Sequence, residues 1–353
     1  IGWDRRRPPG QGPAAGSLGH LRRGLGMAQG LWYHLVNLAS HAEVRIHRDG
    51  NVELLAGVQD IGGGIRTPLA QVVAEELGLP VERIKVSLGD TRLPLGPGSG
   101  GSVTTASITP VARDAAFAAK QALLKELQQV LGLDKPPTLN PDGSIVGLKG
   151  GKPTPALPFK QAAARLRKEQ VVGTAERQAD YGGFQNSART RGTGFGQLGG
   201  VQFAEVEVDT LTGVVRVLRV VAAHDCGRPI NPMLTRSQIY GGVIQGVSYA
   251  LFEDRRLDRK TGKVLNGNFE QYKIAGSLDV PQIDVILLEE LRGRSSTDAS
   301  GIGEPSTVPT AAAVANAIYN AIGVRLRELP ITPARVLAAL QVAATPMPAR
   351  RPT

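Results

Sequence analysis

The chain of 353 residues has few cysteines, few aromatic residues and no long apolar run, and each shortage excludes a class of protein. Its single cysteine, Cys226, excludes an internal disulfide and an iron–sulfur cluster held by the chain's own cysteines. No run of about 20 apolar residues occurs, so no membrane-spanning helix is expected. Aromatic residues make up only 4%, so the core must consist of Val, Leu, Ile and Ala.

The net charge of +10 is concentrated at the two ends of the chain. Residues 1–30 hold five Arg and one Asp, and residues 325–353 hold five Arg and one Glu. A basic end can bind nucleic acid, but these ends lack the interleaved aromatic residues of a single-strand binder. We therefore expect no nucleic-acid partner, and we interpret the ends as solvated segments that meet a partner subunit. The alternative class, a basic RNA-binding protein, would bind polyanions with a steep salt dependence.

One carboxylate, Glu304, stands in the motif Gly301-Ile302-Gly303-Glu304-Pro305, just before an apolar run at residues 308–322 that predicts a buried helix. The glycines permit a tight turn and Pro305 stiffens its exit. A catalytic base is commonly presented on such a loop above a rigid element. The alternative is a surface turn that places a negative charge at a helix start, where it is favourable.

A similar order of elements occurs twice, near residues 42–77 and 201–251. In the first unit, strands at residues 42–46 and 52–55 form a hairpin, and a polar loop then leads to a helix at 68–77. In the second unit, strands at residues 201–208 and 214–223 form a hairpin, and a polar loop leads to a helix at 234–251. This repeat predicts an α+β fold of two similar strand-hairpin-helix subdomains. We place a basic Gly/Pro-rich segment at residues 1–23, the first subdomain at 24–180, the second at 181–342 and a basic tail at 343–353.

The remaining elements are predicted by the same criteria. Strands are expected within residues 25–40 and at 84–88, 171–175, 264–266 and 283–288, and helices at 110–131 and 159–168. The long helix is placed at roughly Pro110 to Leu131, a stretch rich in Ala and Leu.

Two glycine-rich loops are candidate ligand-binding loops. Gly62-Gly63-Gly64 lacks the residues of a phosphate-binding Walker loop and the spacing of a dinucleotide fingerprint. The loop Gly100-Gly101-Ser102-Val103-Thr104-Thr105 is more informative, because it offers backbone donors and three hydroxyls with little side-chain bulk. It can also be a Ser/Thr helix cap, and both roles are compatible because a helix start attracts anions.

Two glutamines, Gln238 and Gln245, lie seven residues apart and therefore share one face of the helix predicted at 234–251. They can bind a ligand oxo group or a pterin edge, or they can be ordinary exposed glutamines. The consecutive His224, Asp225 and Cys226 resemble a metal site, but no further ligands follow at a usual spacing. We interpret them as the end of a strand, with Cys226 a small buried residue, and we predict no protein ligand to a metal.

The ordered motifs resemble those of the large subunit of molybdenum hydroxylases, the xanthine dehydrogenase and aldehyde oxidoreductase family. The motifs are Gly62-Gly63-Gly64, Leu88-Gly89-Asp90-Thr91, Gly100-Gly101-Ser102-Val103-Thr104-Thr105, Gly242-Val243-Ile244-Gln245-Gly246 and Gly303-Glu304-Pro305. The resemblance covers residues 22–340. It implies that both subdomains are of the molybdenum cofactor-binding domain type, and it is closest to the bacterial branch that uses molybdopterin cytosine dinucleotide.

The resemblance also implies roles for individual residues. Glu304 matches the family's general base, which takes a proton from a hydroxide on molybdenum while a hydride passes from the substrate to a sulfido ligand. Gln245 matches a glutamine beside the molybdenum ligands. Where many relatives have Gly-Gln-Gly, this chain has Gly63 in the middle, so one side-chain hydrogen bond to the cofactor is missing. The residues implied to bind the cofactor are Gly62, Gly63, Gly64, Gly101, Ser102, Val103, Thr104, Thr105, Gln238, Gln245 and Gly303.

The family resemblance further implies an oxidoreductase that acts on an aldehyde or an N-heterocycle. The 2Fe-2S and FAD groups of the family would lie on partner subunits, because one cysteine cannot hold a cluster. The N-terminal half of the family's large subunit has no counterpart in this chain, so we expect the chain to be inactive alone. A non-catalytic cofactor-binding or assembly subunit is the alternative. The resemblance is compatible with a bacterial cytoplasmic or periplasmic complex and does not decide between them.

Overall fold

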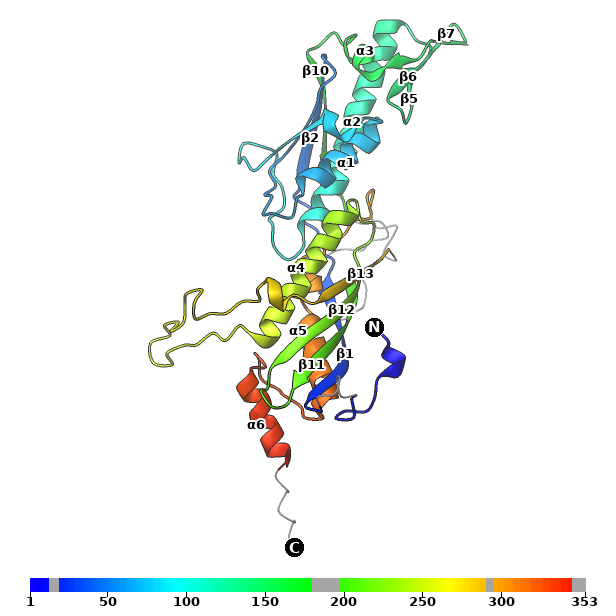
Figure 1. The fold of residues 1–353 in the computed structure, drawn as a ribbon. Coiled ribbons are helices and arrows are strands. Elements are labelled where there is room, and N and C mark those ends of the chain that lie inside the picture. The colour runs from blue at the N-terminus through cyan, green and yellow to red at the C-terminus, as the bar shows by residue number, and fades with distance from the viewer. Residues whose placement is uncertain (13–18, 180–196, 290–294, 345–353) are drawn as a thin grey trace.

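The computed structural model describes residues 1–12, 19–179, 197–289 and 295–344, which form two lobes stacked end to end (Figure 1). Each lobe contains a four-stranded sheet, with strand orders β10-β2-β3-β4 and β1-β11-β12-β13. Each sheet has its own apolar core, one within residues 42–171 and the other within 204–336. The predicted α+β fold with two similar subdomains is therefore confirmed.

The first subdomain contains the sheet β10-β2-β3-β4, which pairs antiparallel, antiparallel and parallel along that order. Helix α2 packs on the sheet, and Gly173 of β10 permits direct contact with the backbone of Ala115 and Ala119. Short strands that follow α2 form two small sheets separate from the main sheet. The elements are β2 (His41–His47), β3 (Val52–Ala56), α1 (Arg66–Leu77), β4 (Ile84–Leu88), α2 (Thr104–Leu131), β5 (Thr138–Leu139), β6 (Ser144–Val146), β7 (Leu148–Lys149), β8 (Lys152–Pro153), β9 (Leu157–Pro158), α3 (Phe159–Ala163) and β10 (Gln170–Glu176).

The second subdomain repeats this arrangement, because β1-β11-β12-β13 also pairs antiparallel, antiparallel and parallel. Helix α5 packs on the sheet, and Gly26 of β1 lies against the backbone of Ala313 and Ala317 as Gly173 lies against α2. The elements are β1 (Leu21–Tyr33), β11 (Gln197–Asp209), β12 (Val215–Asp225), α4 (Pro232–Leu251), β13 (Gln282–Leu288), α5 (Thr310–Ile322) and α6 (Pro333–Ala344).

The edge strand distinguishes the two subdomains. In the first, β10 follows α2 in the sequence, whereas in the second the equivalent strand is β1, which precedes the whole first subdomain. Residues 24–33 therefore lie in the second sheet, although they fall within the range 24–180 predicted for the first subdomain. The described part of the N-terminal segment also packs on the second subdomain, with the Trp3 ring 5.3 Å from that of Phe203. The predicted tail at 343–353 lies almost wholly outside the described residues.

Two further expectations differ from the structure. Helix α2 begins at Thr104, six residues before Pro110, so the proline lies inside the helix. Pro110 cannot donate to the Ala106 carbonyl, and Arg177 Nε donates to that oxygen instead at 3.1 Å. The strand expected at 264–266 is wrong, because within that range only Val264 pairs, through a single bridge to Leu257. No helix in the described part of the chain is both long and apolar enough to cross a membrane.

Candidate functional site

A cavity of about 820 Å³ lies between the two subdomains. The first subdomain contributes residues within 59–68 and 99–105, and the second contributes residues within 226–249 and 299–311, together with Trp32 of β1. Both glycine-rich loops and the Glu304 turn therefore border one space. The volume lies in the range of small-molecule and cofactor sites, roughly 300–1,000 Å³.

Glu304 begins a single 3-10 turn, Glu304–Ser306, at the wall of this cavity. Its Oε1 accepts a hydrogen bond from Gly101 N at 2.8 Å, and its Oε2 accepts one from Ser102 Oγ. In return, Glu304 N donates to Ser102 Oγ at 3.1 Å. Residues about 200 positions apart in the sequence thus fix the carboxylate from the opposite subdomain.

The backbone around Ser102 is unusual. Ser102 has φ of +62°, a left-handed conformation that non-glycine residues seldom adopt. Such backbone strain persists where surrounding contacts hold it, often at functional sites. Here the contacts include the two hydrogen bonds to Glu304 and the bond from Trp32 Nε1 to the Gly101 carbonyl oxygen at 3.0 Å.

A buried polar network supports the Glu304 turn from behind. Gln202 Nε2 donates to the Ser306 carbonyl oxygen at 2.6 Å, and Thr310 Oγ1 donates to Gln202 Oε1 at 2.6 Å. The second N–H of the Gln202 amide faces His224 Nε2 at 3.0 Å, so that nitrogen acts as the acceptor. Burial lowers the pKa of His224 to about 4, which leaves the imidazole neutral at ordinary pH.

The residues beside His224 do not form a metal site within the described structure, where no group of three or more His, Cys, Asp or Glu side chains is arranged to hold an ion. Cys226 is buried as expected, and it also borders the cavity. Burial, with the nearby Asp225 and Glu289 charges, raises the pKa of the Cys226 thiol to about 12. It is therefore protonated and a poor nucleophile.

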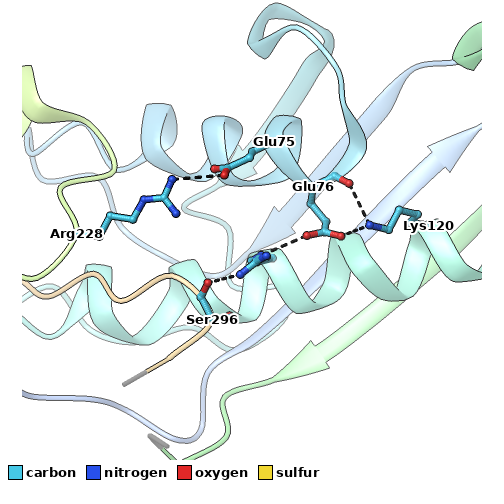
Figure 2. A network of polar contacts seen from close by, with 6 residues as sticks. Glu75, Glu76, Lys120, Arg228 and Ser296 are labelled. Atoms are coloured by element: carbon cyan, nitrogen blue, oxygen red, sulfur yellow. Dashed lines mark hydrogen bonds and ion pairs between the residues drawn. The ribbon is translucent and has the colours of Figure 1, made fainter. Parts of the chain in front are cut away.

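Polar contacts join the two subdomains beside the cavity (Figure 2). Arg228, in the loop after β12, pairs with Glu75 of α1, with Nη2 and Oε1 3.4 Å apart. Arg113 of α2 contacts both Glu76 and the carbonyl oxygen of Ser296, in the segment that leads to Glu304. Lys120 also pairs with Glu76. These contacts place the Glu304 segment relative to the first subdomain.

The loop Gly62-Gly63-Gly64 is shaped by Asp60. Its Oδ1 accepts hydrogen bonds from Gly62 N at 3.1 Å and from Gly64 N at 3.0 Å. Both of these glycines have positive φ, at 103° and 74°. Open space surrounds Gly62 and Gly63, since an added Cβ at either would meet no atom within 4 Å. The loop leaves room for a ligand against its backbone.

The second loop runs directly into a helix. Thr104 and Thr105 form the first turn of α2, and Val103 is the residue before it. The Ser/Thr cap considered from the sequence does not form among the described residues, and Thr104 Oγ1 donates instead to the Gly98 carbonyl oxygen at 3.1 Å. The first turn of α2 therefore has backbone N–H groups without a side-chain cap beside the cavity, an arrangement that favours anions.

Helix α4 brings both predicted glutamines to the cavity. Gln245 Nε2 donates to Tyr249 Oη at 2.7 Å, and Gln245 Oε1 accepts from Thr307 Oγ1 at 3.2 Å. Two glycines of the same helix, Gly242 and Gly246, lie in close contact with neighbouring elements. A Cβ at Gly242 would overlap Ser306, and one at Gly246 would overlap Thr310. They permit close packing of α4 on the Glu304 turn and α5.

The structure brings the sequence-predicted residues together. The cavity is bordered directly by Gly63, Ser102, Thr104, Thr105, Gln238, Gln245, Gly303 and Glu304, while Gly62, Gly64, Gly101 and Val103 lie in the same loops. The sequence did not single out Trp32, Arg228 or Asn231, which also border it. Trp32 could have been noticed as one of only two tryptophans. Arg228 carried no distinguishing signal among many arginines.

Comparison with known proteins identifies the family of the chain. A family model described as the molybdopterin cofactor-binding domain matches residues 1–281. The aldehyde oxidoreductase molybdenum-binding subunit PaoC of Escherichia coli K12 is 33% identical over 336 residues, which are 94% of this chain and 42% of that protein. The putative xanthine dehydrogenase molybdenum-binding subunit XdhA of the same strain is 31% identical over 341 residues, or 95% and 44%. The chain thus spans less than half the length of these relatives.

Solved structures show the same architecture. Quinoline 2-oxidoreductase from Pseudomonas putida 86 superposes with a TM-score of 0.77 at 25% identity, covering 91% of this chain and 42% of that one. Aldehyde oxidoreductase from Desulfovibrio gigas gives 0.67 at 25% identity, covering 92% and 33%. Because the family model covers most of the chain and the relatives align along almost all of it, the chain belongs to the molybdopterin cofactor-binding family that includes aldehyde oxidoreductase and xanthine dehydrogenase molybdenum-binding subunits.

Proposed function

We propose that the chain is the molybdopterin-binding, catalytic portion of a molybdenum-dependent hydroxylase or dehydrogenase that oxidises an aldehyde or an N-heterocycle. The observation that carries this proposal is Glu304, a carboxylate held by Gly101 and Ser102 at the wall of a cofactor-sized cavity. Relatives named for aldehyde and xanthine oxidation support the substrate class.

The residues present suit a molybdopterin cofactor, for which we propose the cytosine dinucleotide form. Gly62, Gly63, Gly98 and Gly100 face open space in which a ligand could approach the backbone closely. Along the described lining, Arg228 is the one cationic side chain, and it would meet a phosphate. The first turn of α2 would supply backbone donors to a second anionic group. When bound, the cofactor supplies the two-electron oxidation chemistry that no side chain of this cavity can supply.

Glu304 serves as the general base in this proposal. Both its oxygens already act as hydrogen-bond acceptors, and the Gly101 and Ser102 donors fix the plane of the carboxylate. A fixed acceptor can take a proton without first reorganising, and general-base catalysis of this type contributes roughly 10²–10⁴-fold to a rate. Gln245 Nε2 would donate to a ligand oxygen in place of Tyr249 Oη, and Gln238 would contact the pterin.

Electrons would leave through partner subunits that carry 2Fe-2S and possibly FAD. A segment that corresponds to the part of the relatives that this chain does not match, in the same or another polypeptide, would complete the substrate pocket. The chain alone would therefore be inactive. A non-catalytic cofactor-binding or assembly subunit is the second candidate.

The test compares Glu304→Gln with wild type, both purified with their partners from the native host. We expect about one molybdenum per chain and a releasable cytosine nucleotide in both proteins. Turnover should fall at least roughly 100-fold in Glu304→Gln. Glu82→Gln, an exposed carboxylate outside the cavity, is the matched control and should retain full activity. Undiminished turnover in Glu304→Gln would exclude the base role, and a folded complex without molybdenum would favour the non-catalytic candidate.

A further inference from the structure

The turn that begins at Glu304 rests on the inner face of the second sheet, the face that α5 covers. The strand register aligns Gly30 of β1 with His224 of β12 across β11, and Gln202 of β11 pairs with the residue two before Gly30, on the same face. A Cβ at Gly30 would contact residues 308–309, which join the turn to α5. The neighbours on this face are small and apolar, namely Ala28, Ala204, Val206, Val220 and Ala222. Gln202 and His224, both 0% exposed, are therefore polar side chains buried on an apolar face.

The neighbours of the Gln202 amide permit it one orientation. Its nitrogen lies 2.6 Å from the Ser306 carbonyl oxygen, and its oxygen lies 2.6 Å from Thr310 Oγ1. If the amide were turned over, two carbonyl oxygens would face each other at this distance, and neither can donate. Gln202 must therefore donate to Ser306, and its second N–H must point at His224 Nε2, 3.0 Å away.

This contact decides the tautomer of His224. Because Nε2 accepts, the proton of the neutral ring lies on Nδ1. Within the described part of the chain, Nδ1 is buried without a hydrogen-bond partner, and it lies over Gly200, where an added Cβ would be 2.1 Å from it. Burying an unpaired N–H is unfavourable, so stability alone does not explain a histidine here. What His224 provides is an acceptor that fixes the amide of Gln202.

Gln202 is connected to Glu304 through the backbone of the turn and does not itself border the cavity. Ser306, whose carbonyl oxygen Gln202 holds, is the last residue of the 3-10 turn that Glu304 begins. Ser306 Oγ also donates to the Gly303 carbonyl oxygen at 2.8 Å, so it ties the residue before Glu304 as well. The first subdomain thus holds the carboxylate, whereas Gln202 holds the backbone that carries it.

We propose that Gln202 is a positioning residue for Glu304: its N–H to the Ser306 carbonyl oxygen holds the turn, and His224 is the acceptor that keeps the amide in that orientation. This inference rests on the proposed function, because that function makes Glu304 the base. One specific hydrogen bond, rather than the general packing of the sheet, then controls the position of the carboxylate. Loss of the N–H should lower kcat and leave KM unchanged, because Gln202 does not line the cavity.

The first experiment compares Gln202→Met with Asn320→Leu in the complex purified from its own host. Asn320 is the matched control, a buried amide near the far end of α5 that accepts from Leu25 N at 2.9 Å and donates to the Arg7 carbonyl oxygen at 2.7 Å. We expect kcat to fall at least roughly 10-fold in Gln202→Met, because a base displaced by less than 1 Å already loses rate, and to be unchanged in Asn320→Leu. Equal losses in the two variants, or none in Gln202→Met, would overturn the inference.

A further variant, Gln202→Glu, isolates the role of the N–H. When protonated, the introduced carboxyl group can donate to the Ser306 carbonyl oxygen, and when ionised it can only accept. Burial raises the pKa of such a carboxyl, so it is protonated at pH 6. The kcat of Gln202→Glu, divided by that of wild type at the same pH, should therefore be largest at pH 6 and fall as the carboxyl ionises. The same ratio for Gln202→Met should not vary with pH. Gln202→Glu no more active than Gln202→Met at pH 6 would contradict the proposal.

The second experiment needs no cofactor and uses the full chain labelled with fluorotryptophan. Trp32 Nε1 donates to the Gly101 carbonyl oxygen at 3.0 Å, and Gly101 N donates to Glu304 Oε1 at 2.8 Å, so a displaced carboxylate should be detected at Trp32. Fluorine NMR should show a shifted Trp32 resonance in Gln202→Met and an unshifted one in Asn320→Leu. The resonance is assigned with Trp3→Phe, since the chain has two tryptophans. An unshifted Trp32 resonance in Gln202→Met would contradict the proposal.

Glu304→Gln in the same kinetic assay separates this inference from the proposed function. Loss of turnover in Glu304→Gln together with full turnover in Gln202→Met rejects only this inference. Undiminished turnover in Glu304→Gln together with a shifted Trp32 resonance in Gln202→Met rejects the proposed function and confirms that Gln202 holds the turn.

Discussion

The two walls of the cavity use the same residue, glycine, in opposite ways. On the wall from the first subdomain, Gly63 and Gly100 face open space. On the wall from the second subdomain Gly241 also faces open space, but Gly242, Gly246 and Gly301 are in such close contact that an added Cβ would overlap a neighbouring residue. One wall is therefore built to admit a ligand and the other is built to hold Glu304 still.

This difference teaches that a glycine-rich motif does not by itself indicate a ligand-binding loop. Both walls belong to subdomains of the same topology, and on the second a buried polar network supports the Glu304 turn from behind. Rigid support behind a catalytic group is expected because misplacement by about 1 Å can cost roughly 100-fold in rate. The four predictions below test whether the walls differ as described.

The largest expected effect is at Gly301. In Gly301→Ala the new Cβ would overlap the Ser102 carbonyl oxygen, so the two subdomains must move apart or the loop must distort. We expect the free energy of unfolding to fall by about 3 kcal/mol, as in other overpacked sites. The matched variant Gly63→Ala, on the open wall, should change it by less than about 0.5 kcal/mol. Urea denaturation of both variants provides the measurement, and equal losses would remove the distinction between the walls.

The next effect concerns pH and His224. Its pKa lies near 4 in the folded chain against an ordinary 6.5, so between these values the unfolded chain binds more protons. Stability should therefore fall as pH falls from 6.5 toward 4, by up to about 3 kcal/mol from this residue. Denaturation of wild type and His224→Gln at pH 7 and pH 4.5 isolates the contribution of His224 to the change in stability, since both proteins contain the same carboxylates. An unchanged pH slope in the variant would show that His224 is not the cause.

A smaller effect distinguishes two adjacent glycines of α4. An added Cβ at Gly241 would meet no atom within 4 Å, whereas one at Gly242 would overlap Ser306. Gly241→Ala should therefore stabilise the chain by about 0.5–1 kcal/mol through helix propensity. Gly242→Ala should destabilise it by about 1–2 kcal/mol despite the same gain. Thermal unfolding compares the two, and changes of the same sign would contradict the packing described for α4.

The smallest effect is chemical and leaves stability unchanged. Cys226 borders the packed wall but is buried, with its pKa raised to about 12. Iodoacetamide at pH 8 should alkylate it roughly 100-fold or more slowly in the folded chain than in urea, because the thiolate reacts and the thiol does not. As Cys226 is the only cysteine, the intact mass reports its modification directly. Rapid alkylation of the folded chain would show that this wall opens to solvent.

The sequence predicted the local features well. Alternating apolar residues predicted the two hairpins, and helical spacing predicted α1 and α4, because these patterns reflect contacts within a short segment. The predicted start of α2 at Pro110 is wrong. The Ala106 carbonyl oxygen accepts a hydrogen bond from Arg177, which is distant in the sequence and could not be assigned to it from the local pattern. The assignment of sites to Gly62-Gly63-Gly64 and to the Glu304 loop remains a prediction, although both border the same cavity.

The sequence alone determined the repeat of hairpin and helix, the glycine-rich loops and the turn that carries Glu304, since each depends on residues close together in the chain. Only the tertiary structure decided that β1 joins the second sheet, that Ser102 contacts Glu304 and that Gly242 serves packing. These features depend on pairings between distant segments, which side-chain patterns within one segment do not encode.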